Sequence, residues 1–413
     1  MHAALPLVLL LFWHRGRREP LYRQRIGERF GFGPVAPHGC IWIFAASLGE
    51  TRAVSPLVRE FLAHGHMILL THSSAAGLRE GQRLFDDPGV IHRYVPLDLN
   101  WAVRRMLRRA RPALGLIVES ELWPAQLLIA RRLGIPMAQV NGNLLDRTIT
   151  RDAGRFGGAR LELLQLFSII LTKSEVYRAR YIRAGVCAQR ILIVGELKFD
   201  QAIEPKQIAF GRALKADAWG AAPILLIASS VEAEEQMLLT MLRELCARSN
   251  ALRIIWAPRS PQRFDAVAKA LNDNGISFER RAQLTPDQPP KTDVLLADSL
   301  GEMNIWYAAA DLVFVGGSLV NHGGHNIVEP LALCKPVVMG DSIFGITFPA
   351  HEAIAAGALR IFPDASALSA EIADLIENPT ALAAMTRCAE GFNDQHKGAS
   401  RRSLAALKQC LEN

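Results

Sequence analysis

Cysteine is scarce in this chain of 413 residues, and the cysteines lie far apart in the sequence. The six are Cys40, Cys187, Cys246, Cys334, Cys388 and Cys410, and none belongs to a C-x-x-C pair. This spacing provides neither a zinc-binding set nor a disulfide framework, so we expect a protein of a reducing compartment.

A long apolar run at the N-terminus is also missing. Residues 3–13 are apolar, but this run of eleven residues ends at His14, Arg15, Arg17 and Arg18. A helix that spans a bilayer needs about 20 residues, and no small-residue cleavage site of a signal peptide follows. We expect residues 1–20 to lie in the cytoplasmic leaflet of a membrane with their arginines at the headgroups, and residues 22–32 to extend this surface. A packed N-terminal helix is the alternative.

The chain has no basic arm interleaved with aromatic residues, although its formal net charge is +7. Because its basic residues are spread out, we expect no nucleic-acid partner, and the charge favours an acidic membrane surface or a phosphorylated substrate. No D-x-D motif occurs, and His322 and His325 lack the further ligands of a zinc site, so we expect no metal. The length and the low charged fraction of 21% predict two globular domains.

Short apolar runs alternate with helical segments along the whole chain. In the first half the expected strands cover residues 40–45, 67–70, 114–118, 136–140, 168–172 and 191–194, and in the second half 223–228, 253–257, 292–296, 312–315 and 336–339. Polar residues follow the end of each run, which is typical of parallel sheets that bind ligands at their carboxyl edge. The pattern breaks near residue 205. We therefore predict an α/β protein of the GT-B type, with two doubly wound Rossmann-like domains, residues 21–205 and 206–413, facing one another across a cleft.

Glycines follow the expected strand at residues 312–315. Gly316 and Gly317 end the strand, Gly323 and Gly324 form a second flexible loop, and a helix is expected to begin near Asn326. A strand, a glycine loop and a helix N-terminus are typical of phosphate binding, because the backbone can approach the anion closely. The loop does not match G-x-G-x-x-G, so a glycine-rich turn without a ligand is the alternative.

Seven motifs, in order along nearly the whole chain, give it a resemblance to a known family. They are Y-R-Q-R-I-G-E-R-F-G at Tyr22, S-L-G-E at Ser47, E-S-E-L-W-P at Glu119, G-E-L-K-F-D at Gly195, A-P-R-S-P-Q-R-F at Ala257, D-S-L-G-E at Asp298 and G-G-H-N-I-V-E-P at Gly323. With these motifs the chain resembles the bacterial 3-deoxy-D-manno-octulosonic acid (Kdo) transferases of glycosyltransferase family 30.

The resemblance implies an activity, its partners and a location. It implies metal-independent, inverting transfer of Kdo from CMP-Kdo to a lipid A precursor in lipopolysaccharide synthesis, with no cofactor beyond the donor itself. The implied location is the cytoplasmic side of the inner membrane. The first domain would bind the acceptor and the second domain the CMP-sugar.

The resemblance also implies roles for individual residues. Glu50 matches the catalytic base, and Glu119 and Lys198 match groups that stabilise the transition state. The implied CMP contacts are Pro258, Arg259, Leu300, Gly301, Glu302, Asn326, Ile327, Val328 and Glu329. The residue types leave simpler interpretations open, since Glu50 could be only a first-turn helix acid and Lys198 only a solvated lysine.

Three positions depart from the family pattern. Phe44 and Ser260 stand where the family usually has histidine, and Ser230-Val231 replaces a Thr-His pair. Two other interpretations therefore remain. One is another GT-B nucleotide-sugar enzyme such as a 2-epimerase, and the other is a lipid A-binding protein that has lost catalysis.

Overall fold

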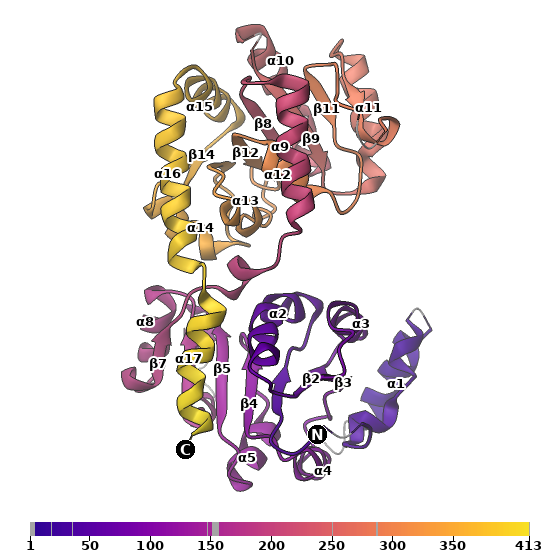
Figure 1. Cartoon of the computed structure of the whole chain (residues 1–413), viewed down its shortest axis with the longest axis vertical. Helices are drawn as coiled ribbons and strands as arrows, with labels where there is room; N and C mark the ends of the chain where they lie inside the picture. Colours follow the sequence, from indigo (N-terminus) through magenta and orange to yellow (C-terminus); the bar gives the residue numbers. More distant parts are fainter. Residues whose placement is uncertain are drawn as a thin grey trace. The chain divides into compact units, whose positions relative to one another are not determined.

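The structure is a computed structural model that describes residues 5–17, 19–34, 36–146, 148–150, 157–249, 251–285 and 288–412. Residues 1–4 and 18 of the expected membrane segment lie outside this described part. The chain divides into two compact units, one formed by Met1–Gln201 with His396–Asn413 and the other by Ala202–Gln395 (Figure 1).

The first unit contains a seven-stranded sheet in which neighbouring strands run parallel, in the order β3-β2-β1-β4-β5-β6-β7. The strands are β1 (Ile41–Phe44), β2 (Ile68–His72), β3 (Val90–Tyr94), β4 (Leu114–Val118), β5 (Met137–Gly142), β6 (Ile169–Thr172) and β7 (Ile191–Ile193). The helices are α1 (Leu5–Arg15), α2 (Leu48–Ala63), α3 (Ala75–Leu84), α4 (Asn100–Ala110), α5 (Pro124–Arg132), α7 (Gly157–Leu164), α8 (Glu175–Arg183) and α17 (Ala399–Leu411), with 3-10 turns η2 (Pro20–Tyr22), η3 (Ile26–Phe30), η4 (Ala188–Arg190) and η5 (Leu197–Asp200).

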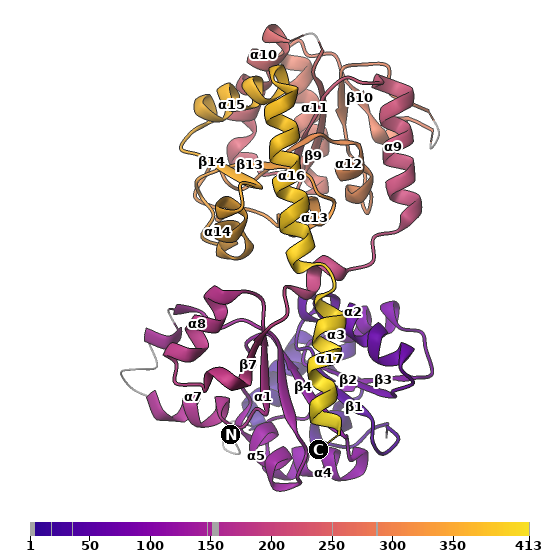
Figure 2. The same cartoon turned by 60° about the vertical axis from the view of Figure 1, so that its left-hand side comes forward.

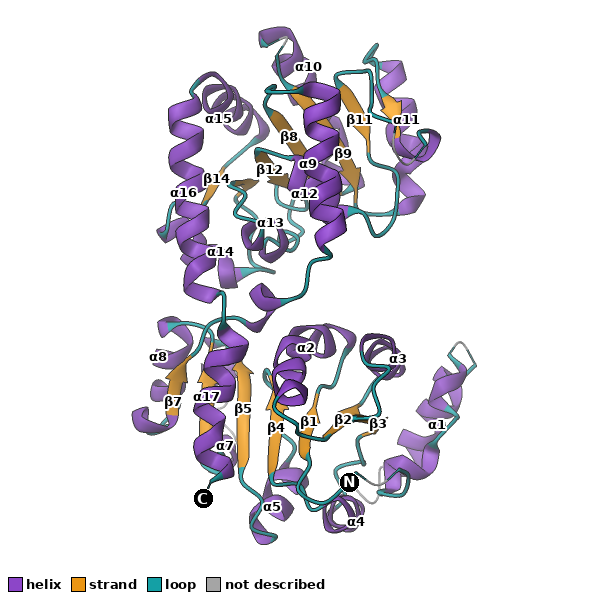
Figure 3. Cartoon of the chain, in the orientation of Figure 1, coloured by secondary structure: helices purple, strands orange, loops and turns teal. Residues whose placement is uncertain are grey.

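Helices cover both faces of the first sheet (Figure 3). Successive side chains of a strand point to opposite faces, and β1 follows this rule. Ile41 and Ile43 belong to the core beneath α2 and α17, whereas Trp42 and Phe44 belong to the core beneath α4 and α5. All four side chains are fully buried, which explains why β1 is apolar without alternation.

The second unit repeats this architecture with a parallel sheet in the order β10-β11-β9-β8-β12-β13-β14. Its strands are β8 (Ile224–Ser230), β9 (Arg253–Pro258), β10 (Glu279–Arg280), β11 (Val294–Leu296), β12 (Leu312–Val315), β13 (Val337–Gly340) and β14 (Leu359–Phe362). Its helices are α9 (Pro205–Trp219), α10 (Glu235–Arg248), α11 (Phe264–Asp273), α12 (Met303–Ala309), α13 (Val328–Ala332), α14 (Thr347–Ala355), α15 (Ala365–Glu377) and α16 (Pro379–His396), with 3-10 turns η6 (Glu232–Glu234), η7 (Pro261–Arg263) and η8 (Arg281–Gln283). The structure thus confirms two doubly wound α/β sheets, and it adds β3, β10 and β14, which the sequence did not predict.

Each sheet has one position where the strand order reverses. In the first sheet it lies between β1 and β4, and in the second between β8 and β12. Connections leave such a pair of strands in opposite directions, so ligands of open α/β sheets bind at the carboxyl ends of these strands. The loops after β1, β4, β8 and β12 are therefore where functional side chains are expected.

The last helix, α17, belongs to the first unit, which corrects the prediction that residues 206–413 form the second domain. α17 packs against α2 (Figure 2). The Asp200 carboxylate accepts hydrogen bonds from the backbone N–H groups of Gly398 and Ser400 at 2.6 and 2.7 Å. An amphipathic helix can cover either sheet, so its partner is decided by such long-range contacts, which the sequence does not display.

Candidate active site

Glu50 lies in the first turn of α2, directly after β1. The Ser47 hydroxyl accepts a hydrogen bond from the Glu50 N–H at 3.2 Å, and the Glu50 Oε2 atom accepts one from the Ser47 N–H at 2.9 Å. This capping box starts the helix. The Ser47 N–H bonds to the Oε2 atom of Glu50, and the backbone of Ala46 also favours the ionised carboxylate.

The Glu50 carboxyl group is mostly buried, with 8% of the residue exposed. Burial raises its pKa to about 7; the Ser47 N–H opposes this shift, and the carboxylates of Glu119 and Glu121 add to it. Because β1 pairs in parallel with β4, the loops that carry Glu50 and Glu119 follow neighbouring strands at the same edge of the sheet. A carboxyl group with a pKa near neutrality is suited to general base catalysis.

Glu119 follows β4, on the other side of the switch point. Its backbone is left-handed, with φ of 57°, a conformation that costs a non-glycine residue about 1 kcal/mol. Two hydrogen bonds hold it there: the Glu119 N–H donates to the Val140 carbonyl at 2.9 Å, and the Gln139 side chain donates to the Glu119 carbonyl at 2.7 Å. The Glu119 carboxylate lies 3.5 Å from the Lys198 ammonium group.

A second ion pair lies next to the first and has no role in the sequence prediction. Lys173 follows β6, Glu196 follows β7, and their charged atoms are 3.0 Å apart with about 5% and 2% of the side chains exposed. Both residues stand just past a strand end, which is the one sequence signal that could have identified them. Four charges of alternating sign, on Glu119, Lys198, Glu196 and Lys173, are thus gathered at this edge.

In the second unit, the N–H groups of the glycine loop donate hydrogen bonds to other groups of the chain. The Gly317 N–H donates to both carboxylate oxygens of Glu234 at 2.8 and 3.0 Å. Gly323 donates to the Ser342 hydroxyl at 3.0 Å, and the remaining two glycine N–H groups bond to backbone carbonyls. The N–H groups of the four loop glycines are therefore occupied, and a phosphate would need other donors.

Glu234 explains why position 316 is a glycine. The Glu234 side chain is fully buried, and a Cβ atom at Gly316 would lie 2.4 Å from its Oε1 atom. Burial raises the pKa of Glu234, while the N–H groups of Gly317 and Val231 oppose this shift. The sequence contained no indication that an internal carboxyl group would fill this loop.

Asn326 and Glu329 are exposed at the start of α13. The side-chain Oδ1 atom of Asn326 accepts from the Val328 N–H at 3.0 Å, and its side-chain Nδ2 atom donates to Glu329 at 3.2 Å. Ile327 and Val328 are buried, at 0% and 6% exposure. Of the four predicted contacts, Asn326 and Glu329 thus present side chains to solvent, and the other two could reach a ligand only through their backbone.

Arg259 follows β9 and is exposed, while Pro258 before it is buried as the last residue of the strand. Burial lowers the pKa of His325 to about 4, and the charges of Arg259 and His322 lower it further. Burial raises the pKa of Tyr307. The charge of Glu329 adds to this rise, and the charge of Arg259 opposes it. The charge of Arg259 thus acts on His325, which follows the glycine loop, and on Tyr307.

The third predicted segment is only partly open to a ligand. Leu300 is 75% exposed and Gly301 has a left-handed φ of 80°. Both carboxylate oxygens of Glu302 accept hydrogen bonds from Arg281 at 3.1 Å. The Glu302 carboxylate is thus already paired, which leaves the backbone of this turn and the Leu300 side chain to meet a ligand.

The residues that depart from the family pattern make contacts within the chain. The Phe44 ring packs edge-on against Trp123 with centroids 5.6 Å apart, as an apolar part of the core. The Ser260 hydroxyl donates to the Gln262 side chain. The Val231 N–H donates to Glu234 at 3.3 Å, so its backbone helps to hold the buried carboxyl group.

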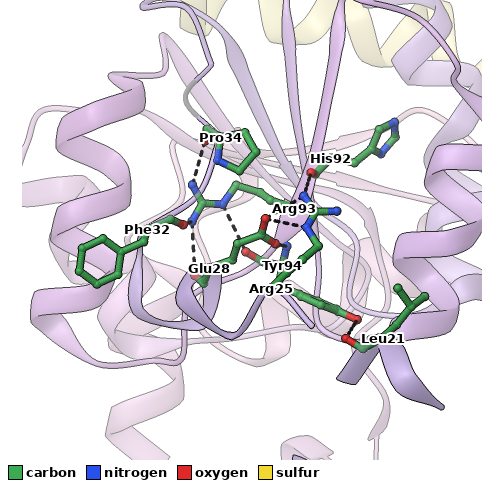
Figure 4. Close-up of polar contacts among 8 residues, drawn as sticks. All are labelled: Leu21, Arg25, Glu28, Phe32, Pro34, His92, Arg93 and Tyr94. Carbon is green, nitrogen blue, oxygen red and sulfur yellow. Dashed lines mark hydrogen bonds and ion pairs between the residues drawn. The ribbon is translucent and has the colours of Figure 1, made fainter. Parts of the chain in front are cut away.

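The first motif, Tyr22 to Gly31, joins the N-terminal segment to β3 (Figure 4). The Glu28 carboxylate accepts from the Tyr94 N–H at 2.8 Å and from Arg25 at 2.7 Å. Arg93 is buried and donates to the carbonyls of Glu28 and Phe32. The expected lipid-facing surface of residues 22–32 therefore does not include Glu28 and Arg29, which are buried, whereas Phe32 is 51% exposed.

Comparison with known proteins identifies relatives over the whole chain. A profile described as 3-Deoxy-D-manno-octulosonic-acid transferase (kdotransferase) matches residues 24–201. The 3-deoxy-D-manno-octulosonic acid transferase of Bordetella pertussis is 37% identical over 421 residues, which cover 98% of this chain and 96% of that protein. The transferase of the same description from Haemophilus influenzae is 31% identical over 417 residues, with 98% and 96% covered.

Solved structures with the same fold have low sequence identity. A putative UDP-N-acetylglucosamine 2-epimerase from Listeria monocytogenes aligns with a TM-score of 0.63 at 15% identity, covering 91% of this chain and 97% of that one. A glycosyltransferase from Rickettsia africae aligns with a TM-score of 0.58 at 14% identity, covering 91% and 99%. These likenesses show the fold alone, which is the GT-B fold.

Replacing Glu50 with glutamine should stabilise the first unit at pH 8 and leave it unchanged at pH 4. The folded protein holds the Glu50 proton up to about pH 7, above the ordinary pKa of 4.5. Stability therefore falls as the pH rises between these values. Glutamine keeps the capping box and cannot ionise, so its advantage above pH 7 should be on the order of 3 kcal/mol. Urea unfolding at the two pH values measures the difference.

Glu80→Gln is the matched control, because the shift there has the opposite sign. Arg83 and Arg52 lower the pKa of Glu80 to about 2. The ionised form is stabilising, so glutamine should destabilise the protein above about pH 4.5, and this loss should fade as the pH falls towards 2. An equal effect of Glu50→Gln at pH 4 and pH 8 would contradict the raised pKa.

Proposed function

The chain belongs to the 3-deoxy-D-manno-octulosonic acid (Kdo) transferase family and is a glycosyltransferase, and we propose that it transfers Kdo from CMP-Kdo to a lipid A precursor. The observation that carries the proposal is the Glu50 carboxyl group, buried, with a pKa of about 7. The Glu119 carboxylate, which pairs with Lys198, adds to this rise in the pKa. These three residues are the proposed catalytic set.

The proposed reaction is a single displacement with inversion. The acceptor is an alcohol with a high pKa, so its oxygen needs a base as it attacks the anomeric carbon of Kdo. Glu50 takes the hydroxyl proton, the new carbon–oxygen bond forms, and the bond to the CMP phosphate breaks with its electron pair leaving on CMP. Glu50 then releases the proton to solvent.

Lys198 has a stabilising role in this proposal. Negative charge moves from the attacking oxygen towards the leaving phosphate, and the Kdo carboxylate adds a fixed negative charge. An ammonium group held in place stabilises such a transition state more than the ground state. Lys198 is about one-third exposed and held by Glu119, so it is both accessible to a substrate and restricted in position.

We assign the donor nucleotide to the second unit, at the β8–β12 switch point. The exposed Arg259 is suited to a phosphate, because guanidinium groups bind phosphate oxygens with two parallel hydrogen bonds. Glu329, which Asn326 holds by a hydrogen bond, is suited to the ribose hydroxyls. CMP carries a single phosphate, so a cation and backbone N–H groups suffice to bind it, and we propose transfer without a metal or other cofactor.

We further propose that the protein acts at the cytoplasmic side of the inner membrane, because an exposed basic and aromatic surface accompanies α1. Within the described part of the chain, no helix has the length and apolar character to cross a membrane. On α1, Leu10, Leu11 and Trp13 are 59%, 51% and 51% exposed. Exposed apolar side chains on a short helix flanked by arginines are typical of a segment lying in the membrane interface.

This surface continues from α1 to α4. Trp101 on α4 is 41% exposed and stacks on Phe30 with ring centroids 5.8 Å apart. The Arg105 guanidinium lies 4.0 Å from the centre of the Phe32 ring. Arginine and partly exposed aromatic rings together suit the headgroup region of an acidic leaflet. The protein would thus meet a lipid acceptor at the membrane surface in which this lipid resides.

The transfer itself is tested by incubating the protein with CMP-Kdo and a glucosamine-disaccharide lipid A precursor. We expect a product heavier by one or more Kdo units, stoichiometric release of CMP, and no loss of rate in EDTA. The kcat/KM value should rise with pH through about 7, since Glu50 must be ionised to act as base. Glu50→Gln should lower kcat by about 100-fold or more.

Glu60→Gln, on the same helix, is the control and should retain the wild-type rate. A wild-type protein that forms no Kdo-bearing product would contradict the transfer. A Glu50→Gln protein as active as the wild type would contradict the assignment of the base.

Membrane association is tested separately by sedimentation with lipid vesicles. Trp101→Ala combined with Phe32→Ala should weaken binding to vesicles rich in acidic lipid by about tenfold, because two anchoring rings are lost. Wild-type binding should also fall steeply with salt. The control is Val176→Ala with Met237→Ala, whose side chains are 45% and 38% exposed outside this surface. Equal binding by the two double variants would contradict the proposed surface.

A further inference from the structure

We propose that Lys173 and Glu196 are positioning residues for Lys198, and that their ion pair fixes the turn on which Lys198 sits. This inference rests on the proposed function, since it explains how that site is held together. Neither residue touches the proposed reacting atoms. Their role would be to determine where the Lys198 ammonium group lies when charge develops on the substrate.

Burial of the Lys173–Glu196 ion pair carries a free-energy cost. The two side chains are almost completely enclosed, and their charged atoms are 3.0 Å apart. Removing two charges from water costs several kcal/mol, and apolar residues of similar volume often serve stability equally well. Stability alone therefore gives little reason for an ion pair at this place in the fold.

Glu196 uses its two carboxylate oxygens for different partners. Its Oε2 atom faces Lys173, and its Oε1 atom accepts a hydrogen bond from the backbone N–H of Lys198 at 3.2 Å. Glu196 is the N-cap of η5, the short turn that carries Lys198. The side chain that pairs with Lys173 thus also holds the backbone of Lys198.

Lys173 also interacts with Glu119, the residue that pairs with Lys198. Burial alone would lower the pKa of Lys173, but Glu196 and then Glu119 raise it, and the net shift is upward. Burial opposes ionisation of Glu196, yet Lys173 and Lys198 lower its pKa. Each lysine therefore interacts with both carboxylates, and a change in one pair alters the other.

The turn η5 is fixed from two further sides, so Glu196 works within a rigid frame. The Leu197 N–H donates to the Asn141 side chain at 3.3 Å. The Glu196 N–H donates to His396 at 3.3 Å, and the His396 ring stacks on Phe199 with centroids 4.7 Å apart. These contacts anchor the ends of the turn, whereas Glu196 is the side chain that binds the Lys198 amide itself.

The test replaces both charges with apolar side chains of similar size, Lys173→Met with Glu196→Leu. The net charge stays the same, but both the ion pair and the acceptor for the Lys198 N–H are lost. We expect kcat for Kdo transfer to fall at least tenfold while KM for CMP-Kdo changes less than threefold. Hydrogen exchange of the segment 197–200 should accelerate at least tenfold, as read by mass spectrometry without any substrate.

Lys215→Met with Asp311→Leu is the matched control. Asp311 also pairs with a lysine, at 2.5 Å, and also accepts a backbone N–H, from Ile224 at 2.9 Å, but it lies at the amino end of β12. The control should shift the thermal midpoint without changing kcat or the exchange of residues 197–200. If the Lys173/Glu196 double variant does not fold, Glu196→Gln, which keeps the size of the side chain, should still lower kcat, and Lys173→Arg should retain it.

Two outcomes would overturn the inference: unchanged exchange of residues 197–200 in the folded double variant, or kcat within twofold of the wild type. An inactive wild-type protein would instead contradict the proposed function. The exchange measurement separates the two failures, because it reports the contact between Glu196 and Lys198 independently of activity.

Discussion

The free energy needed to ionise a buried carboxyl group beside other carboxylates is the constraint on which the first unit depends. Glu50 is held in the first turn of α2 by its bonds with Ser47, so it cannot move out into water. Burial and the nearby Glu119 raise its pKa to about 7. A second carboxylate at this edge is tolerable because Lys198 lies beside it. The turn that carries Lys198 is in turn fixed by Glu196. The proposed base Glu50, the ammonium group of Lys198 and the supporting Glu196 thus form one electrostatic unit at the carboxyl edge of the first sheet.

The two sheets share a topology but use their carboxyl edges differently. In the first sheet, charged side chains collect after β1, β4, β6 and β7. In the second, a buried glutamate, Glu234, fills the glycine loop after β12, and the exposed groups are Arg259, Asn326 and Glu329. This division matches the proposed roles of the two units, which are a tuned base for the acceptor and a recognition surface for the nucleotide. The glycines here permit close packing against a side chain of the chain itself, rather than against a ligand's phosphate.

Much of the fold could be predicted from the sequence because central parallel strands are buried on both faces and are therefore continuous apolar runs. The bounds of β4 and β12 were predicted to the residue. The strands that were not predicted, β3, β10 and β14, lie at the edges of their sheets, where charged residues such as Arg93 and Arg360 interrupt the apolar pattern. Glu50, Glu119 and Lys198 were named from motifs. The pairing of Glu119 with Lys198 could not be predicted, and neither could that of Lys173 with Glu196 or of Glu234 with Gly317, because these contacts join residues far apart in the sequence. The hydrogen bonds of Asp200 with Gly398 and Ser400 at the start of α17 also join residues far apart in the sequence.

Burial and Glu119 together tune the Glu50 carboxyl group to near-neutral pH. The most direct test is a pH titration of its side-chain carbon by NMR, with the signal assigned by its loss in Glu50→Gln. We predict a midpoint near pH 7 in the wild-type protein and a lower midpoint in Glu119→Gln, since a neighbouring negative charge is removed. A midpoint near the ordinary value of 4.5 for glutamate, unchanged by Glu119→Gln, would contradict the account.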